Sequence, residues 1–210
     1  MTRPRVLLAD DHRMVAEGLK GLLAEEFELA GIVEDGRALV KAARELRPDA
    51  IVADISMPHL NGIDALAHLK ADNPDVRVVF LTMHRDVAYA RRALEAGAMG
   101  FVLKHSAPAE LVLALRAALQ GRTFVTPDLA AELIRAHDPH AQANPVAAMT
   151  PRQREILQLF AEGKSAKEIA AALGLSARTV EDHKYRLMES LGIDNSAELV
   201  YFAIKHGLIQ

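Results

Sequence analysis

The stretch IVADISMPHLNG, residues 51–62, decides the fold of this chain. Residues 51–55 form an apolar run typical of strands that are buried on both faces of a sheet, and Asp54 interrupts this run. A loop that ends at Gly62 follows. Because a lone carboxylate is costly to bury and is rarely left unpaired, Asp54 at the end of such a strand indicates a chemical role.

Four further apolar runs lie in the first 120 residues, and segments with helical spacing of leucine and alanine separate them. The runs are RVLLAD (5–10), ELAGIV (28–33), VRVVFLT (76–82) and GFVLK (100–104). The helical segments cover residues 14–27, 37–46, 62–72, 86–97 and 108–119. Continuous apolar strands that alternate with helices predict an α/β domain, with a doubly wound, five-stranded parallel sheet of the flavodoxin-like type.

The composition excludes several classes of protein. The chain has 210 residues, enough for one large domain or two small ones. It has no cysteine, which excludes disulfides, thiolate metal sites and cysteine nucleophiles and is consistent with a reducing cytosol. The apolar run after Arg5 stops at Asp10, too soon for a signal peptide, and no stretch approaches the ~20 apolar residues that span a bilayer. We therefore expect a soluble, cytoplasmic protein without a membrane partner.

The C-terminal part of the chain has a different pattern, without strand signals. Four helices each begin with a capping pattern, at Thr150, Ser165, Ser176 and Asn195. These signals predict a second, all-α domain of four short helices over residues 149–210.

Residues 122–148 are interpreted as a linker between the two domains. Their first part allows a short helix around 127–136, and the remainder, rich in Pro, Ala and Asn, is typical of a flexible connection. His137 and His140 lie there, but no further ligand stands nearby to complete a metal site. The predicted boundaries are residues 1–121 for the first domain, 122–148 for the linker and 149–210 for the second domain.

Polar residues stand at the strand ends of the predicted sheet, where parallel strands converge on one edge. The first strand ends in Asp10 and Asp11, the third in Asp54, the fourth in Thr82 and the fifth in Lys104. Three adjacent carboxylates repel one another unless a cation joins them, and a hard divalent ion such as Mg²⁺ prefers oxygen ligands. Such an ion would also neutralise a phosphoryl group, whose oxygens Lys104 and Thr82 are placed to hold. Each acid alone is consistent with a solvated loop residue, whereas their joint placement favours a site.

Residues 5–120 resemble the receiver domain of two-component response regulators. The resemblance rests on Asp10-Asp11, the loop from Asp54 to Gly62, Thr82, and Gly100-Phe101-Val-Leu-Lys104. It implies that a partner sensor histidine kinase phosphorylates Asp54, which then carries an acyl phosphate. It also implies that Asp10, Asp11, Asp54 and the backbone carbonyl of Ser56 bind Mg²⁺, and that Lys104 pairs with the phosphoryl group.

The resemblance also implies a switch pair, in which Thr82 moves toward the phosphate and Phe101 turns inward. By its position alone, Phe101 is equally consistent with an ordinary core residue. Ser56 and His84 follow Asp54 and Thr82 by two residues, where receivers tune the access of hydrolytic water, although His84 also fits a plain exposed loop.

One departure from many receivers follows the lysine, where His105 stands in place of a proline. A cis peptide bond after Lys104 is therefore not expected, because the cis form of a non-proline bond costs more.

Residues 150–193 have the sequence pattern of a helix–turn–helix, in which a turn that contains glycine precedes a helix predicted over 177–191. By spacing alone, a helical dimerisation domain explains it as well. The segment resembles the LuxR-type helix–turn–helix, and a receiver joined to it is the arrangement of the NarL/FixJ response regulators. The resemblance implies that 177–191 is the recognition helix in the major groove of double-stranded promoter DNA. The predicted DNA contacts and the outward polar residues beside them are Lys164, Lys167, Arg178, Thr179, Glu181, His183, Lys184 and Arg186.

Charge does not by itself indicate a nucleic-acid partner. Residues 150–210 carry 8 Lys and Arg against 8 Asp and Glu, and Glu181 and Asp182 stand where many family members have a basic residue. These acids would either weaken non-specific binding by repelling phosphates or, at Glu181, accept a hydrogen bond from a cytosine amino group. A nearly neutral domain indicates that DNA binding needs two copies, so we expect a homodimer on paired half-sites after phosphorylation.

These observations predict a transcription factor whose DNA binding is controlled by phosphorylation of Asp54, and which is not an enzyme beyond its own phosphoryl transfer. Two alternatives remain at this point. A metal-dependent phosphatase would share the acids and Mg²⁺, but no segment for a lid or substrate pocket is visible. A regulator whose helices bind a partner protein would explain Glu181 and Asp182.

Overall fold

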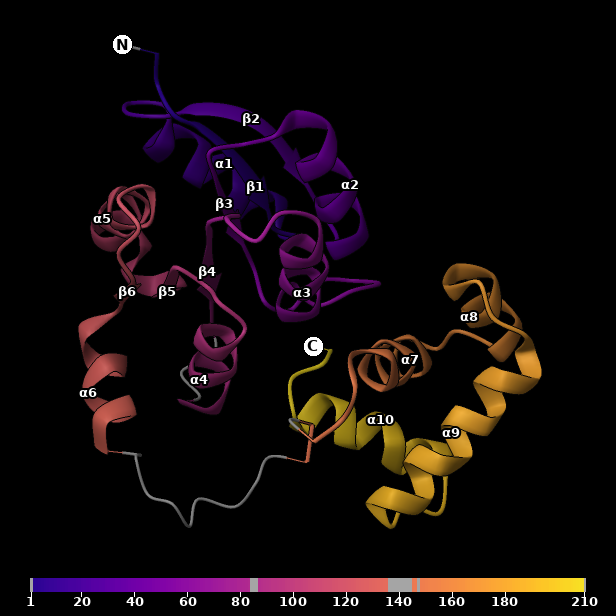
Figure 1. Ribbon diagram of the computed structural model, residues 1–210. Helices are drawn as coiled ribbons and strands as arrows, with labels where there is room; N and C mark the ends of the chain where they lie inside the picture. The colour runs from indigo at the N-terminus through magenta and orange to yellow at the C-terminus, as the bar shows by residue number, and fades with distance from the viewer. Residues whose placement is uncertain (1, 84–86, 136–144, 147, 210) are drawn as a thin grey trace. The chain divides into compact units, whose positions relative to one another are not determined.

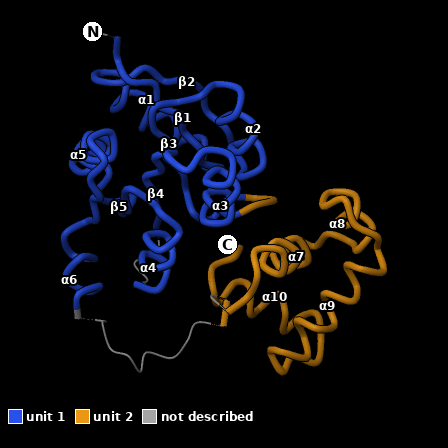
Figure 2. The backbone as a smooth tube through the Cα atoms, in the orientation of Figure 1, with its two compact units in different colours: residues 1–57, 61–142 blue, residues 58–60, 143–210 orange. Residues whose placement is uncertain are grey.

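A six-stranded parallel sheet organises the first unit of the computed structural model (Figures 1 and 2). The strand order is β2-β1-β3-β4-β5-β6. The chain adds β2 on one side of β1 and the later strands on the other side, so the winding of the sheet changes direction between β1 and β3. The strands are β1 (Arg5–Ala9), β2 (Glu28–Val33), β3 (Ala50–Ala53), β4 (Val78–Thr82), β5 (Gly100–Leu103) and β6 (Phe124–Val125). The structure describes residues 2–83, 87–135, 145–146 and 148–209.

Helices cover both faces of the sheet, as the continuous apolar strands predict. Alternate strand residues such as Val6, Val52 and Val102 pack against α1 and α5 in one buried cluster, and α2, α3 and α4 lie on the opposite face (Figure 1). The helices are α1 (Arg13–Leu23), α2 (Gly36–Leu46), α3 (Gly62–Asp72), α4 (Val87–Glu95) and α5 (Ala107–Leu119), with a short 3-10 helix, η1 (Lys104–Ser106), before α5. The doubly wound α/β fold is therefore confirmed.

The structure differs from the sequence prediction at the start of the expected linker. Residues 124–125 form β6, which pairs in parallel with β5, and α6 (Pro127–Arg135) packs against α4. The sheet therefore has six strands rather than five, and the first unit extends past residue 121. The predicted helix around 127–136 is present, whereas His137 and His140 lie outside the described residues.

The second unit contains α7 (Pro151–Ala161), α8 (Ala166–Leu173), α9 (Ala177–Leu191) and α10 (Ser196–Lys205). Complete capping boxes at Thr150 and Ser165 begin α7 and α8, and side-chain caps at Ser176 and Asn195 begin α9 and α10. Gly174 and Gly192 end α8 and α9 in the left-handed region, which glycine adopts without strain. All four predicted helix starts are confirmed.

The core of the second unit is built from apolar residues of its four helices. Ile156, Leu157, Ile169, Val180 and Leu187 are buried together with neighbours from all four helices. Phe160, Leu173 and Leu191 are only partly buried and pack against this core. Helices this short leave the rim of their apolar faces open to solvent. Among the described residues, no helix combines the length and apolar character needed to cross a membrane.

Candidate functional site

The predicted acidic cluster assembles at the carboxyl edge of the sheet. Backbone hydrogen bonds fix the two strand ends there, since the Asp10 amide donates to the Val33 carbonyl and the Asp54 amide donates to the Ala9 carbonyl at 2.8 Å. One ligand atom from each of Asp10, Asp11, Asp54 and also His12 lies within 4.8 Å of the others. Asp10 is only 1% exposed, so the cluster includes a buried carboxyl group.

Lys104 connects two of these carboxylates. Its Nζ atom lies 2.6 Å from Asp54 Oδ2 and 2.9 Å from Asp10 Oδ2, and its side chain is 7% exposed. It stands at the start of η1, directly after β5. Because a buried carboxylate needs a partner, this ammonium explains how both acids are kept in the fold.

Burial and charge oppose each other in the pKa values of this pair. Burial raises the pKa of Asp54 above its ordinary value, and the adjacent Lys104 ammonium offsets this only in part. Burial by itself would lower the pKa of Lys104, but the negative charges of Asp54 and Asp10 outweigh it and leave that pKa raised. Lys104 is therefore a firmly protonated cation at the cluster.

The oxygen atoms of the cluster fit a divalent cation. Asp10 Oδ2 and Asp11 Oδ1 are buried, and neither accepts a hydrogen bond of ordinary geometry. Their near neighbours are nitrogens, Lys104 Nζ at 2.9 Å from Asp10 Oδ2 and His12 Nδ1 at 2.9 Å from Asp11 Oδ1. Carboxylate oxygens that lack hydrogen bonds are the ligands preferred by Mg²⁺, so the residues present suit the ion that the sequence predicted.

The β3–α3 loop is held tightly beneath Asp54. The Asp54 Oδ1 atom accepts hydrogen bonds from the backbone amides of Ile55 at 2.6 Å and Ser56 at 3.4 Å. A Cβ atom at Gly62 would stand 2.2 Å from the Asp54 carbonyl oxygen and 2.9 Å from a ring carbon of Phe80. Asn61 caps α3 by accepting from the Asp64 amide. Only glycine therefore allows this approach, which fixes the backbone of Asp54.

Thr82 and Phe101 are both fully buried on neighbouring strands. Thr82 ends β4 opposite Leu103 of β5, and Phe101 stands opposite Phe80. Phe101 is therefore buried in this structure, while the inward turn that the resemblance assigns to it stays a prediction. His84 lies outside the described residues. Among the described peptide bonds none is cis, so the bond after Lys104 is trans as expected.

His12 is the residue of the cluster that sequence reasoning missed. It stands at the N-cap of α1, and its backbone amide donates to Asp10 Oδ1 at 2.9 Å. The signal that would have found it is its place directly after Asp10-Asp11, at the turn from strand to helix.

The predicted recognition helix has the expected limits, since α9 covers Ala177–Leu191. Of the predicted contacts, Lys167, Arg178 and Arg186 are exposed, whereas Lys164, Thr179, Glu181, His183 and Lys184 are half-buried. The Lys184 ammonium lies 4.9 Å from the centre of the Phe160 ring, a cation–π contact that restrains it. Tyr185 is exposed on α9 and was not among the predicted contacts. The helix therefore presents mixed charge and one aromatic ring to solvent.

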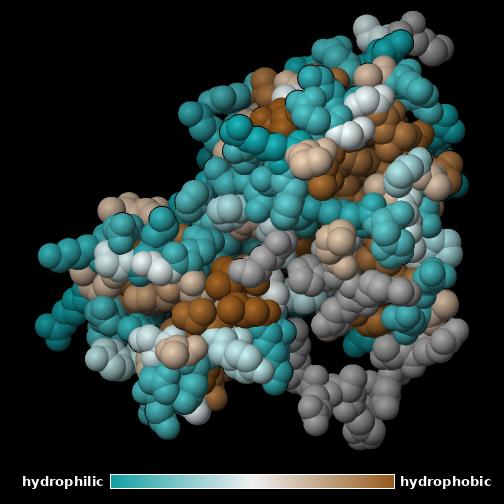
Figure 3. Space-filling view, turned by 180° about the vertical axis from the view of Figure 1, so that it is seen from behind, coloured by the Kyte–Doolittle hydropathy of each residue, from teal (hydrophilic) through white to brown (hydrophobic). Residues whose placement is uncertain are grey.

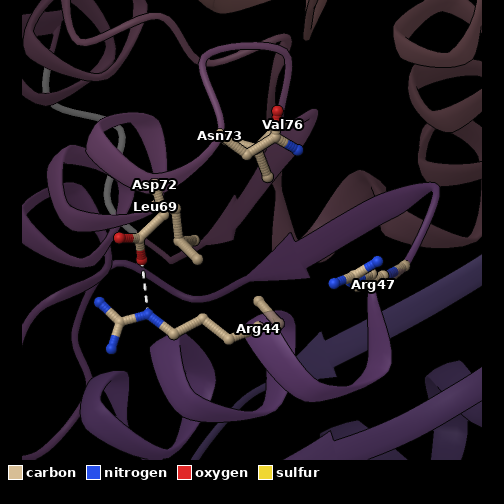
Figure 4. Close-up of a pocket in the computed structure, with 8 residues that line it drawn as sticks. Arg44, Arg47, Leu69, Asp72, Asn73 and Val76 are labelled. Carbon is tan, nitrogen blue, oxygen red and sulfur yellow. Dashed lines mark hydrogen bonds and ion pairs between the residues drawn. The ribbon is translucent and has the colours of Figure 1, made fainter.

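Two of the cavities that described residues line lie in the first unit. One of about 330 Å³ reaches Asp10 and is also lined by Arg13, Ala16 and Glu34. The other, of about 610 Å³, lies between the ends of α2 and α3, where Arg44 Nε donates to Asp72 Oδ2 at 2.6 Å (Figure 4). None of the predicted site residues lines the second cavity, which lies where the chain enters β3 and β4. The acidic cluster is therefore the better candidate for chemistry.

Comparisons with known proteins agree with this geometry. Residues 6–116 match the response regulator receiver domain, and residues 147–203 match the LuxR family of bacterial regulatory proteins. The chain is 32% identical to the response regulator GacA of Pseudomonas viridiflava over 98% of this chain and 97% of that protein. It is 35% identical to the transcriptional regulatory protein MctR of Rhizobium johnstonii over 98% of this chain and 95% of that protein.

Solved structures give the same result. The RcsB response regulator of Salmonella typhimurium, in a structure described for its conformational dynamism in DNA interaction, has a TM-score of 0.68 at 30% identity over 98% of this chain and 99% of that one. An RcsB–DNA complex has a TM-score of 0.59 at 30% identity over 96% and 98%. With a receiver and a LuxR-type DNA-binding domain in one chain, this protein belongs to the NarL/FixJ family of two-component response regulators.

Proposed function

We propose that Asp54 accepts a phosphoryl group from the phosphohistidine of a sensor kinase and that this controls DNA binding by the second unit. The observation that carries the proposal is the cluster of Asp10, Asp11, Asp54 and Lys104 at one edge of the sheet. In the transfer, a carboxylate oxygen of Asp54 forms a bond to phosphorus while the bond from phosphorus to the kinase histidine nitrogen breaks. Positioning and charge neutralisation supply the catalysis of such steps.

Mg²⁺ is the cofactor that we assign to this cluster. Asp10, Asp11 and Asp54 would hold it with the backbone carbonyl of Ser56, and the ion would neutralise charge on the transferred group. Lys104 supplies a second, protein-borne cation, which can follow the new charge because it already contacts Asp54 Oδ2 at 2.6 Å. The phosphoryl group adds about 1.5 to 2 negative charges at neutral pH.

The switch that we infer uses the two buried strand residues beside the site. Thr82 moves toward the phosphate and donates a hydrogen bond to a phosphoryl oxygen, and Phe101 turns inward into the space that Thr82 leaves. Conformers that differ by a few kcal/mol are enough for one phosphorylation to change their populations. Ser56 and His84 then set the rate at which water removes the phosphoryl group.

The second unit would read promoter DNA through α9 in the major groove. Lys164, Lys167, Arg178, Lys184 and Arg186 would meet phosphates or bases, with Thr179, Glu181 and His183 beside them. The exposure of Arg178 and Arg186 supports this placement, and the solved RcsB–DNA complex supports DNA as the partner.

A homodimer is the form in which we expect DNA to be bound. Apolar patches interrupt the largely hydrophilic surface on the face drawn in Figure 3, and in α10 the large side chains of Tyr201 and Ile204 are exposed within one helical turn. A solved structure of RcsB is described as two dimers on two parallel DNAs. We place this regulator in the cytoplasm and propose no enzymatic activity on other substrates.

Sequence selection on random DNA duplexes tests the proposal. Wild type and Asp54→Ala would be compared with Mg²⁺, with and without a small-molecule phosphodonor. We expect the phosphorylated wild type to select a two-fold symmetric site more tightly, and the variant not to respond to the donor. If neither protein selects a sequence while Asp54 still takes phosphate, the helices bind a partner protein instead. Turnover of a generic phosphomonoester would support a phosphatase.

A further inference from the structure

We propose that His12 is a nitrogen ligand of the metal site, so that the receiver binds a first-row transition ion such as Co²⁺ or Zn²⁺ with the help of a residue that Mg²⁺ does not use. The inference rests on the metal site of the proposed function and concerns which ions that site accepts. It is carried by the position of the His12 imidazole against Asp10 and Asp11.

The backbone holds His12 in this position. Its amide donates to Asp10 Oδ1 at 2.9 Å, and its carbonyl accepts the first helical hydrogen bonds of α1, from Val15 and Ala16. The ring is therefore anchored at a helix start rather than on a free loop. Its side chain is 47% exposed, so one edge of the imidazole faces solvent while the Nδ1 edge faces the acids.

The distances are those of neighbouring ligands on one ion. His12 Nδ1 lies 2.9 Å from Asp11 Oδ1 and 3.4 Å from Asp10 Oδ1. Two ligand atoms at about 2.0 to 2.1 Å from a metal are about 2.9 Å apart at a right angle and about 3.4 Å apart at a tetrahedral angle. Both distances are therefore compatible with binding to one metal ion.

A hydrogen bond does not account for the closer contact. Asp11 Oδ1 is buried and accepts no hydrogen bond of ordinary geometry, although His12 Nδ1 lies 2.9 Å away. Asp10 Oδ2, on a side chain that is 1% exposed, also accepts no hydrogen bond of ordinary geometry, but the Lys104 ammonium pairs with it at 2.9 Å. A buried oxygen without a hydrogen bond, such as Asp11 Oδ1, points to a missing ligand, and this oxygen lies beside the imidazole.

The chemistry of the ligands decides which metal ions bind more tightly because of His12. Imidazole nitrogen suits Zn²⁺, Co²⁺ and Ni²⁺, whereas Mg²⁺ prefers oxygen ligands and keeps several waters. His12 should therefore strengthen the binding of the first group and leave the binding of Mg²⁺ to the carboxylates. The identity of residue 12 sets the preference between the two classes of ion.

Titration calorimetry on the full chain tests the inference, with Mg²⁺ alone and Co²⁺ alone as the probes. We compare wild type with His12→Ala, with Asp11→Asn to locate the site, and with His68→Ala as a control that removes an exposed histidine from α3. The expected result is a loss of tenfold or more in Co²⁺ affinity for His12→Ala, a change of less than twofold in its Mg²⁺ affinity, and no change in either for His68→Ala.

The visible spectrum of bound Co²⁺ gives a second readout, because it responds to the loss of a nitrogen ligand. We expect this spectrum to change in His12→Ala and not in His68→Ala. Equal losses of Mg²⁺ and Co²⁺ affinity in His12→Ala, or no loss of either, would overturn the inference. An Asp11→Asn variant that binds Mg²⁺ as tightly as wild type would instead overturn the metal site of the proposed function, so the two failures are distinguishable.

Discussion

Asp54 is held in the fold at an energetic cost. Burial raises its pKa above the ordinary value of 3.8, so the folded chain keeps this proton to a higher pH than the unfolded chain. As pH rises from the ordinary pKa through the raised one, the unfolded chain ionises first and the free energy of unfolding falls. At pH 7 the buried side chain therefore lowers the stability of the metal-free first unit.

We predict that Asp54→Asn stabilises that unit at pH 7 in the absence of metal, because a neutral amide avoids the cost of burying charge. Amide hydrogen exchange of β3 reports the free energy of opening. The gain should fade as the pH falls below the ordinary pKa of 3.8, where both chains become protonated, and the exposed Asp75→Asn should show none. A loss of protection in Asp54→Asn at pH 7 would contradict this account.

Lys104 has the opposite effect, since two buried carboxylates depend on it. We predict that Lys104→Met destabilises the metal-free first unit by roughly 3 to 5 kcal/mol, because it leaves Asp10 and Asp54 without a cation. Mg²⁺ at about 100 times its dissociation constant adds roughly 2.7 kcal/mol and should recover much of this loss. Urea unfolding followed by hydrogen exchange measures both effects. Lys41→Met, at an exposed lysine of α2, is the matched control and should be near neutral.

The sequence predicted which side chains of the site would gather, but not all their contacts. Parallel strands end at one edge, so Asp10, Asp54 and Lys104 could be placed together from their strand positions. The direction of the His12 ring could not, because it depends on how the chain turns from β1 into α1. The contact of Lys104 with both carboxylates likewise depends on a side-chain conformation that spacing does not encode.

The β3–α3 loop depends on one close backbone approach. We predict that Gly62→Ala destabilises the first unit by roughly 1 to 3 kcal/mol, the usual cost of overpacking, because the new Cβ would stand 2.2 Å from the Asp54 carbonyl oxygen. The same displacement should lower the rate of Asp54 phosphorylation by a small-molecule donor by tenfold or more, since the nucleophile loses its alignment. Phosphoprotein gels over time measure that rate.

Glycines in α1 provide the control for this loop. A Cβ at Gly18 meets nothing within 4 Å, so Gly18→Ala should stabilise the chain by roughly 0.5 to 1 kcal/mol through helix propensity. Its phosphorylation rate should match that of wild type. A normal rate in Gly62→Ala would show that the loop tolerates the added methyl group and that Asp54 is aligned by other contacts.

Long elements were predictable and the shortest one was not. The helix over 177–191 follows from helical periodicity, and the five longer strands follow from apolar runs of several residues. β6 has only two residues, Phe124–Val125, and two residues are too few to form a recognisable apolar run. Its place in the sheet comes from pairing with Gly100 and Phe101, a tertiary contact that composition alone does not reveal. For the same reason, the predicted linker began too early.

The two units together carry a function that neither charge nor fold explains alone. The chain has a formal net charge of −3, and its DNA-binding part is neutral when Lys and Arg are set against Asp and Glu. Non-specific binding to DNA grows with the number of phosphates that a protein neutralises. A DNA-binding domain without net charge should therefore bind random DNA weakly. It should gain affinity mainly through contacts with the bases of its specific site and through the second copy in a dimer.

The adjacent acids of α9 give this argument a direct test. We predict that the double variant Glu181→Gln, Asp182→Asn binds random-sequence duplexes about fivefold more tightly than wild type, since removing two charges near phosphates relieves roughly 1 kcal/mol. Its preference for the selected site should shrink, because Glu181 no longer accepts from a cytosine amino group as a carboxylate. Fluorescence anisotropy with both duplexes at several salt concentrations measures the two quantities.

Glu189→Gln is the control, since that exposed acid lies near the end of α9, away from the N-terminal residues with which recognition helices read bases. Unchanged affinity for random DNA in the double variant would mean that these acids do not face the phosphates.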